Sequence, residues 1–160
     1  MLNTIFPKQF DNVFRGYKMA IWILGLVVFV KMMMGFNSAG LNPWVSTQFV
    51  IKNADGITLD SFGPEAASVI VFMFKAWGLG LLILSLLGIL AIVRYRSMIP
   101  LMYLVLLIEQ IGRKIMITLG PIITSTTVDN SSSAVPINLI ITLILCFGFI
   151  LSLQNKKNII

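Results

Sequence analysis

The sequence predicts an all-α integral membrane protein, a four-helix transmembrane bundle formed by one domain over residues 1–160. The first observation is composition, because 58% of the residues are hydrophobic, 11% are charged and the mean hydropathy is +0.94. Soluble domains average about 45–50% apolar and about 25% charged residues. The second is that four segments reach the ~20 apolar residues that a helix needs to cross a bilayer. These segments are residues 18–36, 67–93, 97–119 and 136–154. Hydrocarbon offers the backbone no water, so each segment is expected to be helical.

Lysine and arginine residues near the segment ends predict the orientation, because cytoplasmic loops of membrane proteins are enriched in them. One side of the predicted bundle has seven bases and a single acid, Asp11. The seven bases are Lys8, Arg15, Lys18, Arg94, Arg96, Lys156 and Lys157. The other side has five bases and five acids, so the net charge of +6 lies on one face. We therefore expect both termini to be cytoplasmic in a bacterial inner membrane, in contact with membrane lipids and not with nucleic acid.

Residues 4–18 are predicted to form an interfacial N-terminal helix. Apolar residues recur there at helical spacing, with charged and polar residues between them. The apolar positions are Phe6, Phe10, Val13, Phe14 and Tyr17. Such a helix would lie in the cytoplasmic membrane interface, with its apolar face in the lipid and its bases near anionic headgroups. Docking of a partner protein is the alternative role for the same helix.

The first outer loop, about residues 37–66, is predicted to contain a β-hairpin. Two short β-prone runs, Gln48–Lys52 and Ile57–Leu59, flank the turn-forming sequence NADG. Two such runs joined by a turn are typical of a hairpin. We expect this hairpin to form a lid on the outer side of the bundle.

The segment 67–93 contains a pair of small residues, Ala76 and Gly80, at a spacing of four. Small residues at this spacing let a second helix approach closely. The second helix belongs either to the same bundle or to another copy of the chain, and both explanations stay open.

Several catalytic classes are excluded or disfavoured by residue usage. The chain has no histidine, which is the commonest general base and metal ligand. Its one cysteine, Cys146, cannot form an internal disulfide or a CxxC redox pair. No paired acids and no Gly-rich phosphate loop occur. We therefore expect no metal, no cofactor and no autonomous enzymatic activity.

Charged residues interrupt the third apolar segment at YLVLLIEQIGRKIMITLGP, residues 103–121. An ionised group in hydrocarbon costs several kcal/mol unless it is paired or hydrated. At about 1.5 Å per residue, the bases of the first three segments fall at similar heights in the outer half of the bundle. Glu109 can pair with Arg113, four residues on, in the favoured order, and Lys31 can add a second partner. The predicted polar layer, which is our candidate ligand site, comprises Glu109, Gln110, Arg113, Lys114, Lys31 and Lys75.

Three roles for this layer remain open. It is a structural polar cluster whose outer bases extend to the membrane surface. Alternatively, Glu109 and Arg113 line a pocket under the lid for an anionic ligand, such as a lipid headgroup, a carboxylate or a quinone-type oxygen. In the third interpretation Glu109 carries protons in transport or redox chemistry, as intramembrane acids do elsewhere.

The sequences KAWGLGLL and EQIGRK, with an Arg-bearing turn between their helices, resemble small uncharacterised bacterial membrane proteins of the DoxX-like group. The resemblance implies a four-helix bundle, and some DoxX-like proteins are subunits of quinone-linked oxidoreductases. The residues and the resemblance together predict a non-enzymatic membrane protein. It would be an accessory subunit of a larger complex, a homo-oligomer or a lipid-associated binding protein. A small carrier or quinone-linked redox subunit that uses Glu109 and Arg113 is the alternative.

Overall fold

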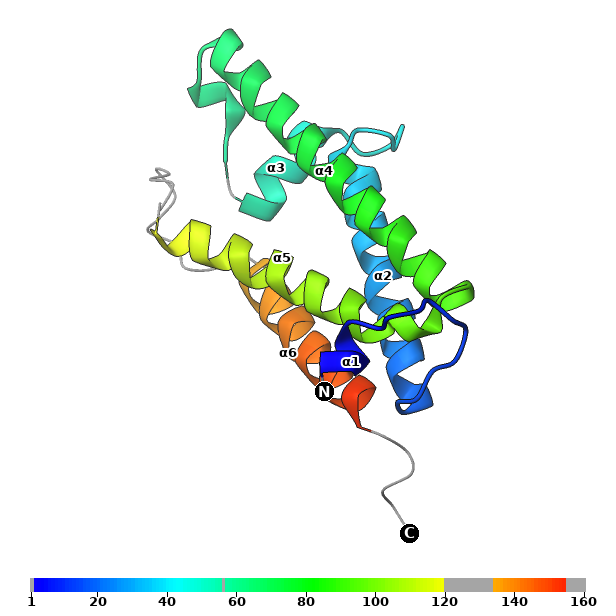
Figure 1. The fold of residues 1–160 in the computed structure, drawn as a ribbon. Helices are drawn as coiled ribbons and strands as arrows, with labels where there is room; N and C mark the ends of the chain where they lie inside the picture. Colours follow the sequence, from blue (N-terminus) through cyan, green and yellow to red (C-terminus); the bar gives the residue numbers. More distant parts are fainter. Residues whose placement is uncertain (1, 56, 120–133, 155–160) are drawn as a thin grey trace.

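The computed structural model describes residues 2–55, 57–119 and 134–154, and regular secondary structure within them is entirely helical (Figure 1). The elements are α1 (Leu2–Ile5), α2 (Lys18–Ser38), α3 (Thr47–Asp55), η1 (Leu59–Ser61), α4 (Pro64–Val93), η2 (Arg96–Met98), α5 (Ile99–Leu119) and α6 (Ala134–Leu153). The all-α prediction is therefore confirmed for this part of the chain. Lys156 and Lys157 lie outside the described residues, as does most of the second outer loop.

The four long helices form two pairs, α2 with α4 and α5 with α6, and α2 also packs on α6. A tight turn through η2 joins α4 to α5, and the two helices diverge from it (Figure 1). The main core lies near this turn, where the four long helices meet. Its buried residues are Ala20, Leu24, Val27, Val28, Ala91, Ile99, Met102, Tyr103, Leu106, Leu107, Ile141 and Leu145.

Small residues of α4 determine how closely α2 approaches it. A Cβ atom added to Gly78 would lie 2.8 Å from the carbonyl carbon of Ser38, and one added to Gly88 would lie 2.5 Å from Cγ2 of Val28. Ala76 and Gly80 are instead exposed, and a Cβ on Gly80 would have no neighbour within 4 Å. The prediction that Ala76 and Gly80 form a helix contact within the bundle is therefore wrong. The alternative, that they form a contact with another copy of the chain, stays a prediction.

Two of the helices, α2 and α4, are long and apolar enough to cross a membrane, judged by length and composition. The described part of α6 contains a shorter apolar run, Asn138–Leu153. The remaining long helix, α5, carries the charged side chains of Glu109, Arg113 and Lys114. A membrane protein with four spans thus stays a prediction.

The predicted β-hairpin of the first outer loop is wrong, because Thr47–Asp55 forms the helix α3. Ser46 provides the N-terminal cap, since the backbone N–H of Phe49 donates to its Oγ at 3.2 Å and that of Val50 donates to its carbonyl oxygen at 3.2 Å. Helix formation also turns Ile51 inward, where it is fully buried. The second run, Ile57–Leu59, leads into the short 3₁₀ turn η1.

The interfacial N-terminal helix is also wrong over most of its length, because α1 ends at Ile5 and residues 6–17 are not helical. Asp11 favours a local turn, in which its Oδ1 accepts a hydrogen bond from the backbone N–H of Val13 at 3.2 Å. Residues 6–17, which we call the N-terminal strap, cross the end of the bundle near the α4–α5 turn (Figure 1). We call this the basic end, because Lys8, Arg15, Lys18, Arg94 and Arg96 all belong to its segments.

Candidate functional site

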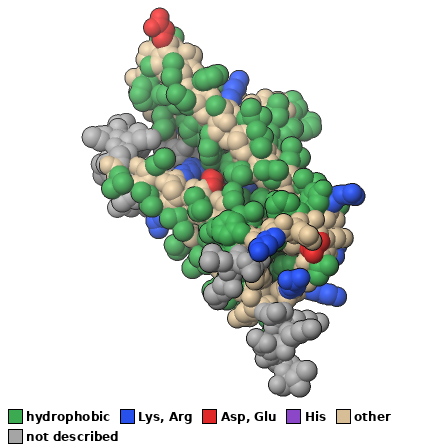
Figure 2. Space-filling model, in the orientation of Figure 1, with side chains coloured by type: hydrophobic (Ala, Val, Ile, Leu, Met, Phe, Trp, Pro, Cys, Tyr) green, Lys and Arg blue, Asp and Glu red, His purple; other side chains and the backbone are tan. Residues whose placement is uncertain are grey.

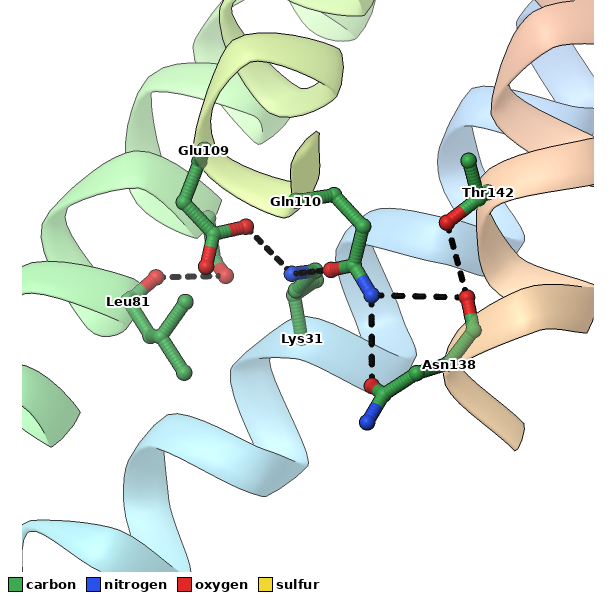
Figure 3. A network of polar contacts seen from close by, with 7 residues as sticks. Lys31, Leu81, Glu109, Gln110, Asn138 and Thr142 are labelled. Carbon is green, nitrogen blue, oxygen red and sulfur yellow. Dashed lines mark hydrogen bonds and ion pairs between the residues drawn. The ribbon is translucent and has the colours of Figure 1, made fainter. Parts of the chain in front are cut away.

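Lys31 is the centre of a polar network inside the helical bundle (Figure 3). Its side chain comes from α2 and is only 2% exposed. The ammonium group forms an ion pair with the carboxylate of Glu109 and donates a hydrogen bond to Oε1 of Gln110 at 2.6 Å. Glu109 and Gln110 are consecutive in α5, so their side chains point about 100° apart around the helix and reach Lys31 from two sides.

Gln110 extends the network to α6. Its Nε2 donates to Oδ1 of Asn138 at 3.2 Å, and Oγ1 of Thr142 donates to the backbone carbonyl of Asn138 at 2.8 Å. Side-chain hydrogen bonds therefore connect α2, α5 and α6 at one height of the bundle. Each buried polar group that finds a partner in this way avoids the desolvation penalty of an unpaired one.

One oxygen of the network lacks a partner. Oε1 of Glu109 is buried, and no donor among the described residues lies within hydrogen-bonding distance of it. Figure 3 shows the carboxylate directed toward the α4 backbone at Leu81, whose carbonyl already accepts a hydrogen bond from Ser85 Oγ at 2.8 Å. An unsatisfied buried acceptor costs about 1–3 kcal/mol. This oxygen is thus a position where a donor from a bound molecule would be stabilising.

Arg113 joins α5 to α4 near the network. Its guanidinium lies over the ring of Trp77, 4.5 Å from the ring centroid, in a cation–π contact. Phe74 contacts the same indole edge-on, with ring centroids 5.7 Å apart. The ion pair described for Glu109 is with Lys31 of another helix, and the predicted pairing of Glu109 with Arg113 on the same helix stays a prediction.

The predicted polar layer is therefore brought together only in part. Lys31, Glu109 and Gln110 are in direct contact. Lys75 is exposed and lies against the turn after α2, where a Cβ on Gly40 would be 3.1 Å from Lys75 Cε. Lys114 is exposed on α5. Figure 2 shows charged side chains of both signs in a recess between α5 and the N-terminal half of α4, with apolar surface around them.

Asn138 and Thr142 are part of the network but were not among the predicted residues. They are four residues apart and thus share one face of an otherwise apolar helix. That spacing is the signal that would have found them, because a polar face on an apolar helix needs a polar partner inside the bundle.

Tyr103 makes a second buried polar tie that the prediction lacked. Its hydroxyl donates to the backbone carbonyl of Ala20 at 2.6 Å, and the side chain is fully buried. A glycine in α6 makes room for the ring, since a Cβ on Gly148 would lie 2.5 Å from Tyr103 Cε1. The tie connects α5 to α2 nearer the basic end than the Lys31 network does.

Within the described residues, no three side chains of His, Cys, Asp or Glu form a group that could hold a metal ion. No protein family, curated protein or solved structure matches this chain.

Proposed function

We propose that this chain is a non-enzymatic four-helix protein of a bacterial inner membrane that serves as an accessory subunit of a larger membrane complex. The observation that carries the proposal is the Lys31 network. It joins three helices through one fully buried base and one acid, so the two charges neutralise each other inside the bundle. A paired charge of this kind fixes how helices are rotated against each other without needing a substrate.

The membrane location is supported by the apolar surface. Large hydrophobic side chains are exposed along the whole of α4, and soluble monomers rarely expose apolar patches of such extent. These residues are Val69, Phe72, Met73, Leu79, Ile83, Leu86, Leu87, Ile89, Leu90 and Val93. The bases at the basic end favour placing that end in the cytoplasm, with both termini on the same side.

The role as a subunit is supported by Ala76 and Gly80. Both are exposed on α4, and the space beside Gly80 is open. In a membrane, small residues spaced by four allow close contact between helix backbones, where van der Waals packing drives association. A transmembrane helix of a partner protein fits this surface.

The test is native mass spectrometry of the protein, gently extracted from its own membrane. We expect a larger membrane protein to be released with it at fixed stoichiometry. A Gly80→Leu variant should lose this partner, whereas Leu86→Phe, which enlarges an exposed residue on another face of α4, should keep it. Release of the chain alone, with Gly80→Leu behaving as the unaltered protein, would contradict the proposal.

A second candidate function is a small carrier or quinone-linked redox subunit. The observation that favours it is Oε1 of Glu109, which is buried and has no hydrogen-bond partner in the part of the chain that the structure describes. Arg113 lies one turn further along α5. A quinol or carboxylic acid, whose O–H can donate to this oxygen, would favour this function over that of an accessory subunit if it is retained in the same mass spectra and lost in Arg113→Gln.

A further inference from the structure

A groove of about 380 Å³ lies at the basic end, away from the Lys31 network. The N-terminal strap forms one wall together with Thr4 of α1. Ser97 of η2, Pro100 of α5 and Ser152 of α6 contribute the rest. Three separate parts of the chain thus build the groove, which the predicted N-terminal helix would not have formed.

The strap is held in a defined position by backbone contacts. The backbone N–H of Asp11 donates to Ser97 Oγ at 3.0 Å, and that of Ser97 donates to the carbonyl of Asp11 at 3.2 Å. Further along, the N–H of Tyr17 donates to the carbonyl of Leu151 at 3.2 Å. Gly16 sits so close to α6 that an added Cβ would lie 2.6 Å from the carbonyl oxygen of Ser152. The groove is therefore a built feature of the folded chain.

The walls carry hydrogen-bond donors that the fold does not use. Lys8 and Arg15 line the groove, and neither forms an ion pair or a side-chain hydrogen bond within the described residues. Thr4 and Gln9 also line it, again with no side-chain hydrogen bond in that part of the chain. The acid on the wall, Asp11, accepts a hydrogen bond from the N–H of Val13. Two cations against one acid leave the groove with a positive surplus.

We infer that this groove binds the headgroup phosphate of an anionic phospholipid. A guanidinium fork and an ammonium group recognise phosphate oxygens, and neutral donors from Thr4 and Gln9 can complete the hydrogen bonding. Lys18, Arg94 and Arg96 are exposed at the same end and repel a headgroup that carries its own cation. This inference concerns a different site from the proposed subunit contact, and it rests on the proposed function only for the location of the chain in a membrane.

Apolar side chains beside the groove favour a lipid over a soluble phosphate. Val13 lines the groove, and Phe6 and Phe10 flank the lining residues Pro7, Lys8 and Gln9 in the sequence. These three side chains, which we call the apolar rim, are 56%, 53% and 57% exposed, respectively. Apolar side chains beside basic ones are typical of segments that sit at the boundary between headgroups and acyl chains. A phosphate ion would use the cations but would gain nothing from this rim.

The test uses the full-length protein in detergent, titrated with dioleoyl phosphatidylglycerol or dioleoyl phosphatidylcholine and followed by native mass spectrometry. We expect preferential retention of phosphatidylglycerol. The Lys8→Gln/Arg15→Gln variant should bind it roughly 30-fold more weakly, since each base near an anionic surface contributes about a fivefold factor. Both residues are exposed, so the thermal unfolding temperature should not change.

The matched control is Lys18→Gln/Arg94→Gln, which removes the same charge from the same end but alters no residue lining the groove. It should keep most of the affinity. An equal loss in both double variants would show diffuse charge attraction and overturn the groove as the site. Equal retention of the two lipids would overturn recognition of the anionic headgroup.

Two further measurements distinguish a lipid headgroup from a soluble phosphate ligand. One uses inorganic phosphate as a competitor, and the other uses the rim variant Phe6→Ser/Phe10→Ser. For a lipid, the rim variant should weaken retention, and equimolar inorganic phosphate should not displace the lipid. Displacement at equal concentration, with no effect of the rim variant, would identify a soluble phosphate ligand and overturn the lipid assignment.

Discussion

At the scale of single residues, the buried ammonium group of Lys31 is expected to stabilise the fold through its ion pair with Glu109. Replacing it by methionine would fill a similar volume, but among the described residues it would leave neither oxygen of the Glu109 carboxylate with a partner. Removing one member of a buried ion pair typically costs about 3–5 kcal/mol. We expect Lys31→Met to lower the thermal unfolding temperature in detergent strongly. Lys75→Met, at an exposed position on α4, should change the free energy of unfolding by less than about 0.5 kcal/mol.

A double-mutant cycle tests whether Lys31 and Glu109 act as a pair. Glu109→Gln removes the charge but keeps an acceptor for Lys31, so it should cost less than Lys31→Met. Once Lys31 is absent, Glu109→Gln removes an unpaired buried charge and should become stabilising. Contacting residues show coupling free energies of about 0.5–3 kcal/mol. Simple addition of the two effects in equilibrium unfolding would mean that the ion pair contributes no coupling.

Part of this site could be predicted because charged residues in an apolar helix must find partners. Rise per residue places Lys31 and Glu109 at similar heights, and the structure brings them into contact. However, the height of a residue along its helix does not predict how that helix is rotated about its own axis. Contact of Arg113 with Trp77, and of Gln110 with Asn138, depends on that rotation, which packing of the whole bundle decides.

At the scale of elements, the hairpin and the N-terminal helix were predicted wrongly for two different reasons. Short apolar runs fit both a strand and a helix, so the sequence 48–52 was compatible with either. Ser46 favours the helix by capping the N-terminus of α3. In the N-terminal segment, helical spacing of aromatic residues competes with long-range hydrogen bonds to Ser97 and Leu151, and these bonds come from segments far along the chain.

Gly78 and Gly80 give a matched test of how α2 packs on α4. An alanine at position 78 would place its Cβ 2.8 Å from the carbonyl carbon of Ser38. This neighbour is a backbone atom, so it cannot move aside as easily as the end of a flexible side chain. Overpacking of this kind costs about 1–3 kcal/mol. Alanine at position 80 has open space and should gain up to about 1 kcal/mol of helix propensity. Thermal unfolding in detergent should therefore show opposite shifts, and shifts of the same sign would contradict the observed α2–α4 contact.

At the scale of the whole molecule, the predicted segments correspond to α2, α4, α5 and α6, because apolar length is a strong signal for a long helix. Sequence does not indicate how these helices diverge. The helices α4 and α5 diverge from the tight turn that joins them (Figure 1). Further along, the contact of Arg113 with Trp77 connects the two helices.

The proposed orientation in the membrane gives the final prediction. If the basic end faces the cytoplasm, Asn12 of the strap and Asp60 of η1 lie on opposite sides of the bilayer, and both side chains are exposed. Cys146→Ser provides a cysteine-free background. A membrane-impermeant maleimide should label Asp60→Cys in intact cells and should label Asn12→Cys only after the membrane is permeabilised. The physical reason for this asymmetry is that Lys and Arg near the ends of membrane segments are retained on the cytoplasmic side during insertion. Equal labelling of both positions in intact cells would argue against a membrane-spanning arrangement, and labelling of Asn12→Cys alone would reverse the orientation and place the phosphate-binding groove outside the cell.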